Sequence, residues 1–313
     1  MQIVDAATTR RHLGFAALIP ALRTMFVAGC EVPQRHVHTI ADRDDAAAPR
    51  GTVLVMPAWR AGQRFGLKTV MIFPGNSARG LPGLHSTYLL YDAATGQPLA
   101  QLDGDEITTR RTAAAAALAA SYLARADARR LLIVGAGRVA ALLADAMRAV
   151  RPIAEVVVWN HRRDGAERLA AALRAAGLAA RASDDLAASV AAADIVSCAT
   201  LSNAALIEGR WLARGTHLDL IGSFTPQMRE ADAACFESAR VFVDTPEALV
   251  KSGDLLQAIA EGGFAPAALQ GTLADLCAGR SPGRGGADEI TLFKAVGSAL
   301  EDLAAAELVY ERL

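Results

Sequence analysis

The pattern of apolar and polar positions changes near residue 112. Before that point, residues 8–29 place apolar side chains at helical spacing and predict one helix that ends at Gly29. A polar gap rich in Asp and Ala leads up to Pro49. Strand-like runs separated by turn residues then follow closely, at 52–56, 65–73, 87–91 and 98–102. Closely spaced strands without helices between them predict an antiparallel sheet.

Beyond residue 112, strand and helix patterns alternate. A wholly apolar run predicts a buried strand at 131–134, and a second apolar run predicts a strand at 156–159. Further strand-like runs follow at 194–200, 217–221 and 240–244. Such alternation predicts an α/β domain with a Rossmann-type, doubly wound parallel sheet. The run 288–297 leads into a final helix from Ser298, which we expect to pack back and close the α+β part at the N-terminus.

The first buried strand ends in a G-x-G-x-x-A turn that is typical of dinucleotide sites. Gly135 permits the tight turn, and Gly137 lets a pyrophosphate approach the backbone, next to the free N–H groups of a helix N-terminus. The cofactor contacts predicted in this loop are Gly135, Ala136, Gly137, Arg138 and Val139.

The end of the second buried strand indicates which dinucleotide binds. A domain that prefers NAD places an acidic residue here, on the ribose hydroxyl. This chain has Asn160, His161, Arg162 and Arg163, with no carboxylate before Asp164. One or both arginines can pair with a 2′-phosphate, although a solvated helix start would also explain them. We therefore predict NADPH as the preferred cofactor and expect that NADH is also used.

Composition narrows the class of protein. The 313 residues can hold two domains, and the net charge of −1 gives no case for binding nucleic acid or a membrane surface. The hydrophobic pattern predicts no membrane-spanning segment, and the N-terminal residues do not resemble a signal peptide. The four scattered cysteines predict reduced thiols and no metal site. We expect a cytoplasmic enzyme.

Lys68 and Arg111 are the candidates for chemistry in the first part. On the pattern alone, a lone lysine on a strand is more often a solvent-facing residue. Arg111 precedes an alanine-rich helix, and capping of that helix near Thr112 would explain much of the run around it. No residue between Gly135 and Asp244 looks like a poised proton donor, so we expect the substrate site in the first part.

Short motifs throughout the chain resemble the ornithine cyclodeaminase/mu-crystallin family. They are VMPA (55–58), GLK (66–68), TGQPL (95–99), TxxRTAA (108–114), VGAG (134–137), ADIV (193–196), AT (199–200), GS (222–223), RE (229–230) and FKxVGxALEDL (293–303). The resemblance implies a nicotinamide-dependent homodimer. Residues 1–112 with 295–313 would bind substrate and form the dimer contact, and residues 113–294 would bind the dinucleotide.

The resemblance also assigns residue roles. Lys68 is similar to the family's catalytic lysine, and Arg111 to its arginine for the substrate carboxylate. Arg35 resembles a second carboxylate contact, and Met56 would line the pocket. The further cofactor contacts that it implies are Thr112, Ala199, Thr200, Gly222 and Lys294.

One loop departs from the family pattern. Cyclodeaminases and alanine dehydrogenases of the family carry an aspartate where this chain has Phe224, and phenylalanine cannot be a general base. This departure argues against both activities, unless Asp219 or Glu230 acts as a relocated base.

Reduction of a preformed cyclic imine acid fits what remains: delta-1-pyrroline-2-carboxylate, or delta-1-piperideine-2-carboxylate, to L-proline or L-pipecolate. Arg111 and Arg35 would hold the carboxylate, and Lys68 would supply the imine proton or stabilise nearby charge. Cyclodeaminase or alanine dehydrogenase activity stays an alternative. So does a non-catalytic NADPH-binding protein like mu-crystallin, although Lys68 and Arg111 argue against it.

Overall fold

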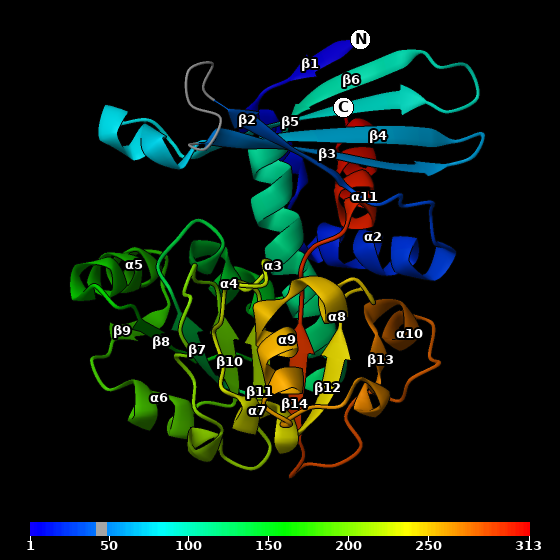
Figure 1. The fold of residues 1–313 in the computed structure, drawn as a ribbon. Helices are drawn as coiled ribbons and strands as arrows, with labels where there is room; N and C mark the ends of the chain where they lie inside the picture. Colours follow the sequence, from blue (N-terminus) through cyan, green and yellow to red (C-terminus); the bar gives the residue numbers. More distant parts are fainter. Residues whose placement is uncertain (42–48) are drawn as a thin grey trace. The chain divides into compact units, whose positions relative to one another are not determined.

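The computed structural model describes residues 1–41 and 49–313; residues 42–48, which belong to the predicted polar gap, lie outside the described residues. The chain divides into two compact units (Figure 1). Unit 1 comprises Met1–Arg111 and Ser298–Leu313, and unit 2 comprises Thr112–Gly297. Within the described ranges, no helix has the length and hydrophobicity to cross a membrane.

The described part of unit 1 contains a sheet with the strand order β1-β6-β5-β4-β3-β2. Strands β3 to β6 are antiparallel as predicted; β2 also pairs antiparallel, with β3, and β1 pairs in parallel with β6. The hydrophobic pattern did not predict β1 and β2, because β1 has three residues and β2 is almost wholly exposed. The strands are β1 Gln2–Val4, β2 His36–Ala41, β3 Pro49–Arg60, β4 Arg64–Ile72, β5 Leu84–Asp92 and β6 Pro98–Asp103.

The helix predicted over 8–29 is in fact two helices, α1 (Ala6–His12) and α2 (Phe15–Ala28). The Asp5 carboxylate caps α1 by accepting a hydrogen bond from the Thr8 N–H at 2.8 Å, and extended backbone at Gly14 separates the two helices. A short 3-10 helix, η1, covers Pro74–Arg79. The last helix, α11 (Ala299–Tyr310), packs against α2, β3 and β4 and so closes the core of unit 1, as expected (Figure 1).

Helix α3 (Gly104–Leu123) starts earlier than the sequence indicated. Its first turn is capped by Asp103, whose carboxylate accepts a hydrogen bond from the Glu106 N–H at 2.8 Å. The interpretation of Thr112 as a residue near the helix start is therefore wrong. Arg111 lies inside the helix, where its side chain can reach the core of unit 1.

Unit 2 is an eight-stranded parallel sheet with the order β13-β12-β14-β11-β10-β7-β8-β9, flanked by helices (Figure 1). The predicted doubly wound arrangement is confirmed. The strands are β7 Arg130–Val134, β8 Glu155–Trp159, β9 Ala179–Ala182, β10 Ile195–Cys198, β11 His217–Leu220, β12 Ala239–Val243, β13 Gly271–Thr272 and β14 Ile290–Lys294. The helices are α4 Ala140–Arg148, α5 Arg163–Ala175, α6 Leu186–Ala192, α7 Ala233–Glu237, α8 Ala248–Lys251, α9 Gly253–Ala260 and α10 Leu273–Cys277, with 3-10 turns η2 Gly209–Trp211 and η3 Pro266–Ala268.

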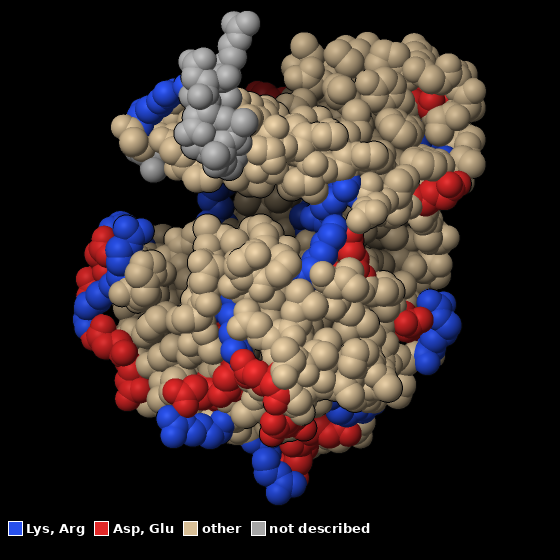
Figure 2. Space-filling view, viewed as in Figure 1, with Lys and Arg blue, Asp and Glu red and all other residues tan. Residues whose placement is uncertain are grey.

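The central strands of unit 2 carry near-continuous buried apolar residues, such as Leu132, Val196 and Leu218, because helices cover both faces of a parallel sheet. Charged side chains of both signs are interspersed on the face of unit 2 seen in Figure 2. The order of strands reverses at β7, whose neighbours are β8 and β10. Open α/β sheets bind ligands at this reversal, beyond the carboxyl ends of the strands.

Candidate functional site

The glycine loop at the end of β7 has the conformation that its sequence predicts. Gly135 has φ +114°, and a Cβ added there would lie 2.5 Å from the carbonyl oxygen of Ala199, so a side chain is excluded. A Cβ added to Gly137 would meet nothing within 4 Å, which leaves this backbone open to a ligand. At this turn Gly135 packs closely against Ala199, whereas the backbone of Gly137 is accessible to a ligand. A pyrophosphate site requires both properties.

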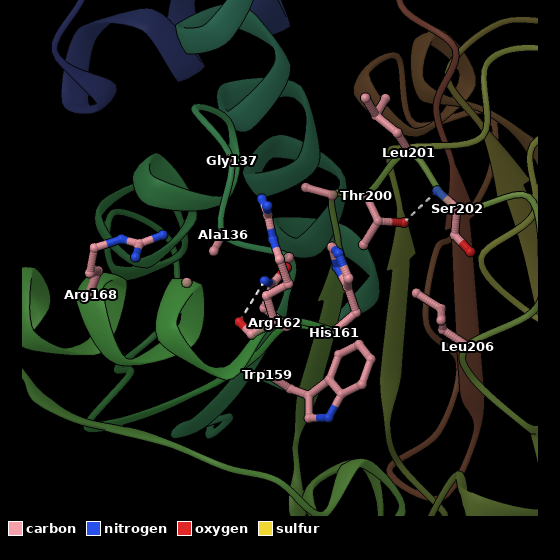
Figure 3. A pocket seen from close by; sticks show the side chains of 14 residues that line it. Ala136, Gly137, Trp159, His161, Arg162, Arg168, Thr200, Leu201, Ser202 and Leu206 are labelled. Atoms are coloured by element: carbon pink, nitrogen blue, oxygen red, sulfur yellow. Dashed lines mark hydrogen bonds between the residues drawn. The ribbon is translucent and has the colours of Figure 1, made fainter. Parts of the chain in front are cut away.

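A cavity of about 510 Å³ opens at the ends of β7, β8 and β10 (Figure 3). Eight residues of the predicted cofactor site line it: Gly135, Ala136, Gly137, Asn160, His161, Arg162, Ala199 and Thr200. The sequence did not single out six further lining residues: Trp159, Gly165, Arg168, Leu201, Ser202 and Leu206. The loop, the cavity and the place of strand reversal together fit a dinucleotide.

Arg162 and Arg163, which were considered together in the sequence analysis, have different surroundings in the structure. Arg162 lines the cavity, whereas Arg163 pairs with Glu167 at 2.7 Å and with Asp184. Arg168 approaches the same cavity from α5 (Figure 3). It is an arginine on a charged helix face, so the pattern gave no reason to prefer it.

Asn160 holds the turn that presents Arg162. Its side-chain amide donates to the carbonyl oxygen of Arg162 at 2.9 Å. A Cβ at Gly165 would lie 2.7 Å from this amide nitrogen, so glycine permits α5 to start close to the turn. Asp164, the nearest carboxylate, is paired with Arg168 at 2.6 Å. The cavity therefore presents cations at the position where NAD-preferring domains present an acid.

Several predicted cofactor residues lie outside the lining of this cavity: Thr112, Arg138, Val139, Gly222 and Lys294. Gly222 donates its N–H to Glu230 at 2.7 Å, and Lys294 is fully buried beside Asp254 at 3.3 Å. Contacts of these residues with a cofactor stay predictions.

Glu230 links two turns at the carboxyl ends of the strands through hydrogen bonds. Its carboxylate accepts hydrogen bonds from the N–H and hydroxyl of Thr200, at 2.7 and 2.8 Å, and from the N–H of Gly222. Asp219 is equally buried, and its carboxylate is bonded to the Ser197 hydroxyl. These contacts argue against either residue as a relocated general base.

Lys68 lies inside unit 1 rather than on an exposed edge. Even-numbered residues of β4 face the helices, and Lys68 is only 1% exposed, so the interpretation from pattern alone is wrong. Its Nζ lies 2.6 Å from the carboxylate of Asp302 on α11. Met56 on β3 and Tyr88 on β5 are its cross-strand neighbours.

Arg111 reaches the same carboxylate from α3. Its Nε donates to Asp302 Oδ1 at 3.0 Å, and its Nη1 donates to Glu301 at 2.8 Å. The structure thus brings together Lys68, Met56 and Arg111 as predicted site residues, with two acidic partners that the sequence did not single out. The partners lie in the motif FKxVGxALEDL, but no spacing rule links them to Lys68.

The cluster has defined protonation states at neutral pH. Burial lowers the pKa of Lys68 to about 8, with Arg111 and Arg35 acting in the same direction and Asp302 opposing them. Although burial alone would raise it, the pKa of Asp302 lies below its usual range because Lys68 and Arg111 stabilise the carboxylate. Arg35 is half-buried and close enough for its charge to act on Lys68. The acidic side chains of the site thus neutralise part of its positive charge, and the remaining positive charge suits an anionic substrate.

Comparisons with known proteins show the family of the chain. The chain matches the ornithine cyclodeaminase/mu-crystallin family over residues 6–313, and it belongs to that family. A delta(1)-pyrroline-2-carboxylate reductase from Paracoccus denitrificans is 43% identical over 310 residues, which cover 98% of this chain and 96% of the relative. The expected enzyme class, an oxidoreductase, is confirmed by such relatives.

Solved structures show the same fold. The Thermococcus litoralis delta(1)-pyrroline-2-carboxylate reductase, in complex with NADH and L-proline, superposes with a TM-score of 0.92 at 30% identity, covering 100% of this chain and 97% of that one. An archaeal alanine dehydrogenase dimer with bound NAD has a TM-score of 0.91 at 27% identity, covering 99% and 95%. The nicotinamide cofactor expected from the glycine loop is the kind that these neighbours hold.

Proposed function

We propose that this chain is an NAD(P)H-dependent reductase of cyclic imine acids, which converts delta-1-pyrroline-2-carboxylate to L-proline. Delta-1-piperideine-2-carboxylate, reduced to L-pipecolate, is the second candidate substrate. The observation that carries the proposal is the buried pair Lys68 and Arg111, held by one carboxylate within 3.0 Å of both. A protein that only bound a dinucleotide would have no use for two desolvated cations in unit 1.

Each residue has a separate task in the proposed reaction. Arg111, together with Arg35, binds the substrate carboxylate through charge-assisted hydrogen bonds. Lys68 is mostly protonated at neutral pH, since its pKa is about 8, and it donates the proton to the imine nitrogen or stabilises charge beside it. When bound, the dinucleotide supplies the hydride for the C=N carbon.

The residues of unit 2 hold the cofactor. Gly135 and Gly137 would receive the pyrophosphate, and Arg162 with Arg168 would pair with a 2′-phosphate, which favours NADPH over NADH. Phe224 is 41% exposed and brings no titratable group to the loop after β11. This absence of a base in the loop supports reduction of a preformed imine over deamination of an amino acid.

A substrate panel tests the proposal. Purified protein is mixed with each of the two cyclic imines, ornithine, and pyruvate plus ammonia, with NADPH or NADH in turn, and oxidation of the cofactor or release of ammonia is followed. Rapid oxidation of NADPH with a cyclic imine is the expected result. Ammonia release from ornithine without imine reduction, or cofactor binding without turnover on any compound, would refute it.

We further propose that the active form is a homodimer in the cytoplasm, joined through the outer face of the unit 1 sheet. Helix α11 packs on the other face, with α2 against it (Figure 1), and uncharged residues dominate the visible surface of unit 1 (Figure 2). The outer face carries half-buried apolar side chains at alternate positions, among them Val55, Trp59, Phe65, Leu67, Leu89 and Tyr91. Trp59 and Tyr91 both contact Phe65, with ring centroids 6.0 and 5.8 Å away.

A second copy would bury this apolar face, since a patch of this kind marks an interface. The solved dimer of the alanine dehydrogenase supports the idea. Sedimentation should show a dimer for the native chain and a monomer for Phe65→Asp; a native monomer at micromolar concentration would contradict the proposal.

A further inference from the structure

A single carboxylate connects the two cations of the unit 1 cluster. Asp302 Oδ2 lies 2.6 Å from Lys68 Nζ, and Asp302 Oδ1 accepts from Arg111 Nε at 3.0 Å. The three side chains come from α11, β4 and α3, and each is at least nine-tenths buried. The carboxylate therefore fixes the distance between the two cations through its own two oxygen atoms.

Burial disfavours a charged lysine, and a second cation nearby disfavours it further. The groups that face Lys68 are Asp302 from α11, Arg111 from α3, Arg35 from the segment before β2, and Tyr88 from β5. Tyr88 is neutral, because burial raises its pKa well above the usual value. Asp302 is thus the one anion that acts on Lys68 among these neighbours, whereas Glu301 pairs with Arg111.

We propose that Asp302 is a positioning residue, which keeps Lys68 in its charged form and aims Arg111 in the proposed substrate site. The inference rests on the proposed function for the roles of Lys68 and Arg111. Both roles then depend on the Asp302 carboxylate. Asp302 itself is not assigned a step with the substrate.

Asp302→Asn tests the inference, since the variant keeps the size of the side chain and removes its charge. An opposite charge at this distance shifts a pKa by about 1–3 units. The alkaline limb of kcat/KM, which reports loss of the proton from Lys68, should therefore move to lower pH by at least about one unit. At pH 8 the rate should fall about fivefold or more, since a pKa lowered from about 8 by one unit reduces the protonated fraction of Lys68 from about one half to about one tenth.

Glu301→Gln is the matched control. Glu301 precedes Asp302 in the same helix and touches Arg111 at 2.8 Å, but its charge is not among the main influences on the pKa of Lys68. This variant should raise KM and leave the alkaline limb in place. Glu307→Gln lies further along α11, where Glu307 pairs with Arg60 at 2.6 Å, and it should leave both unchanged.

A direct titration keeps the inference testable if the proposed function fails. The chain contains three lysines, Lys68, Lys251 and Lys294, so a protein labelled with ¹³C at lysine Cε gives three resolvable signals. In the native chain the Lys68 signal should titrate near pH 8, and in Asp302→Asn it should titrate lower, with Lys251 as internal reference.

An unchanged Lys68 titration in a folded Asp302→Asn protein would overturn the inference. So would a lower melting temperature as the variant's only defect, because this would reduce Asp302 to a structural residue. Failure of the native chain on every imine, with the Lys68 titration shifted as expected, would refute the proposed function alone.

Discussion

Both units bury a lysine among acidic side chains, but the two clusters differ in the donors that satisfy the acids. In unit 1, Asp302 and Glu301 are bound by the side chains of Lys68 and Arg111. In unit 2, Lys294 lies within ion-pair distance of the Asp254 carboxylate, at 3.3 Å. Other buried acids lie close enough for the charge of Lys294 to act on them: Asp219, Glu230 and Asp244.

The unit 2 acids depend largely on backbone N–H groups. Asp254 accepts from Glu230 and Ala231 at 2.7 and 3.1 Å, and Asp244 accepts from residues 296 and 297 at 2.8 and 2.6 Å. A carboxylate bound to backbone amides fixes a loop, whereas one bound to cationic side chains fixes functional groups. Similar residue types thus build a scaffold in unit 2 and, by our proposal, a substrate site in unit 1.

Replacing Lys68 should have the largest effect on catalysis. Lys68→Met should reduce kcat by about 10²–10⁴, because it removes the proposed proton donor. Binding of NADPH, measured by fluorescence titration, should be unchanged, since the cavity at the glycine loop lies in unit 2. Near-normal turnover in this variant would show that Lys68 is not a catalytic residue. The proposed difference in role between the two clusters would then be wrong.

Replacing Glu230 should instead affect stability. In Glu230→Gln, the side-chain amide would face an N–H donor of Thr200 or Gly222, which leaves a buried donor unpaired. We expect a loss of about 1–3 kcal/mol in the free energy of unfolding, measured with urea, together with weaker cofactor binding. The Lys68 titration should not move. A stable variant that binds NADPH normally but has lost turnover would point to a catalytic role for Glu230.

Asp219 should make the stability of unit 2 depend on pH. Burial raises the pKa of Asp219 to about 7, so the folded state retains a proton that the unfolded chain has lost. Its contribution to stability is full below pH 3.8 and is lost as the pH rises to about 7, at up to about 1 kcal/mol per pH unit. Asp219→Asn should flatten this decline in a series of melting curves. A decline that is as steep in the variant would place its origin elsewhere.

The smallest expected effect concerns exposed cations, which solvent screens. Arg162→Ala and Arg168→Ala should each raise KM for NADPH several-fold, up to about tenfold, and leave KM for NADH nearly unchanged. Arg163→Ala is the control, because Arg163 does not line the cavity. Equal effects on both cofactors would contradict the assignment of a 2′-phosphate site.

The fold could be predicted where burial imposes a pattern. The runs that form β7, β8, β10, β11 and β12 could be recognised as strands in the sequence, because helices cover both faces of this parallel sheet. The exposed edge strand β2 and the start of α3 were missed, since an exposed strand need not alternate and Asp103 caps the helix ahead of its apolar part.

The site was only partly predictable. The glycine loop and Arg162 could be identified locally, because each lies in the turn that follows a buried strand, β7 for the loop and β8 for Arg162. Burial of Lys68 depended on which face of β4 meets the helices, and the local pattern does not contain this information. Asp302, the carboxylate that Lys68 and Arg111 share, lies 191 residues from Arg111 along the chain. Local spacing contains no information about a contact of that range.

The position of α11 has a consequence for synthesis on the ribosome. Unit 1 begins the chain, but α11, which completes its core, follows the whole of unit 2. A growing chain therefore exposes Lys68 and Arg111 without their counter-charges until residues 112–297 have been made. Domains generally fold as units during synthesis, so unit 2 can fold once residues 112–297 have emerged. Unit 1 can complete its core only after α11 has been made. The proposed substrate site therefore forms after the whole cofactor-binding unit has been translated.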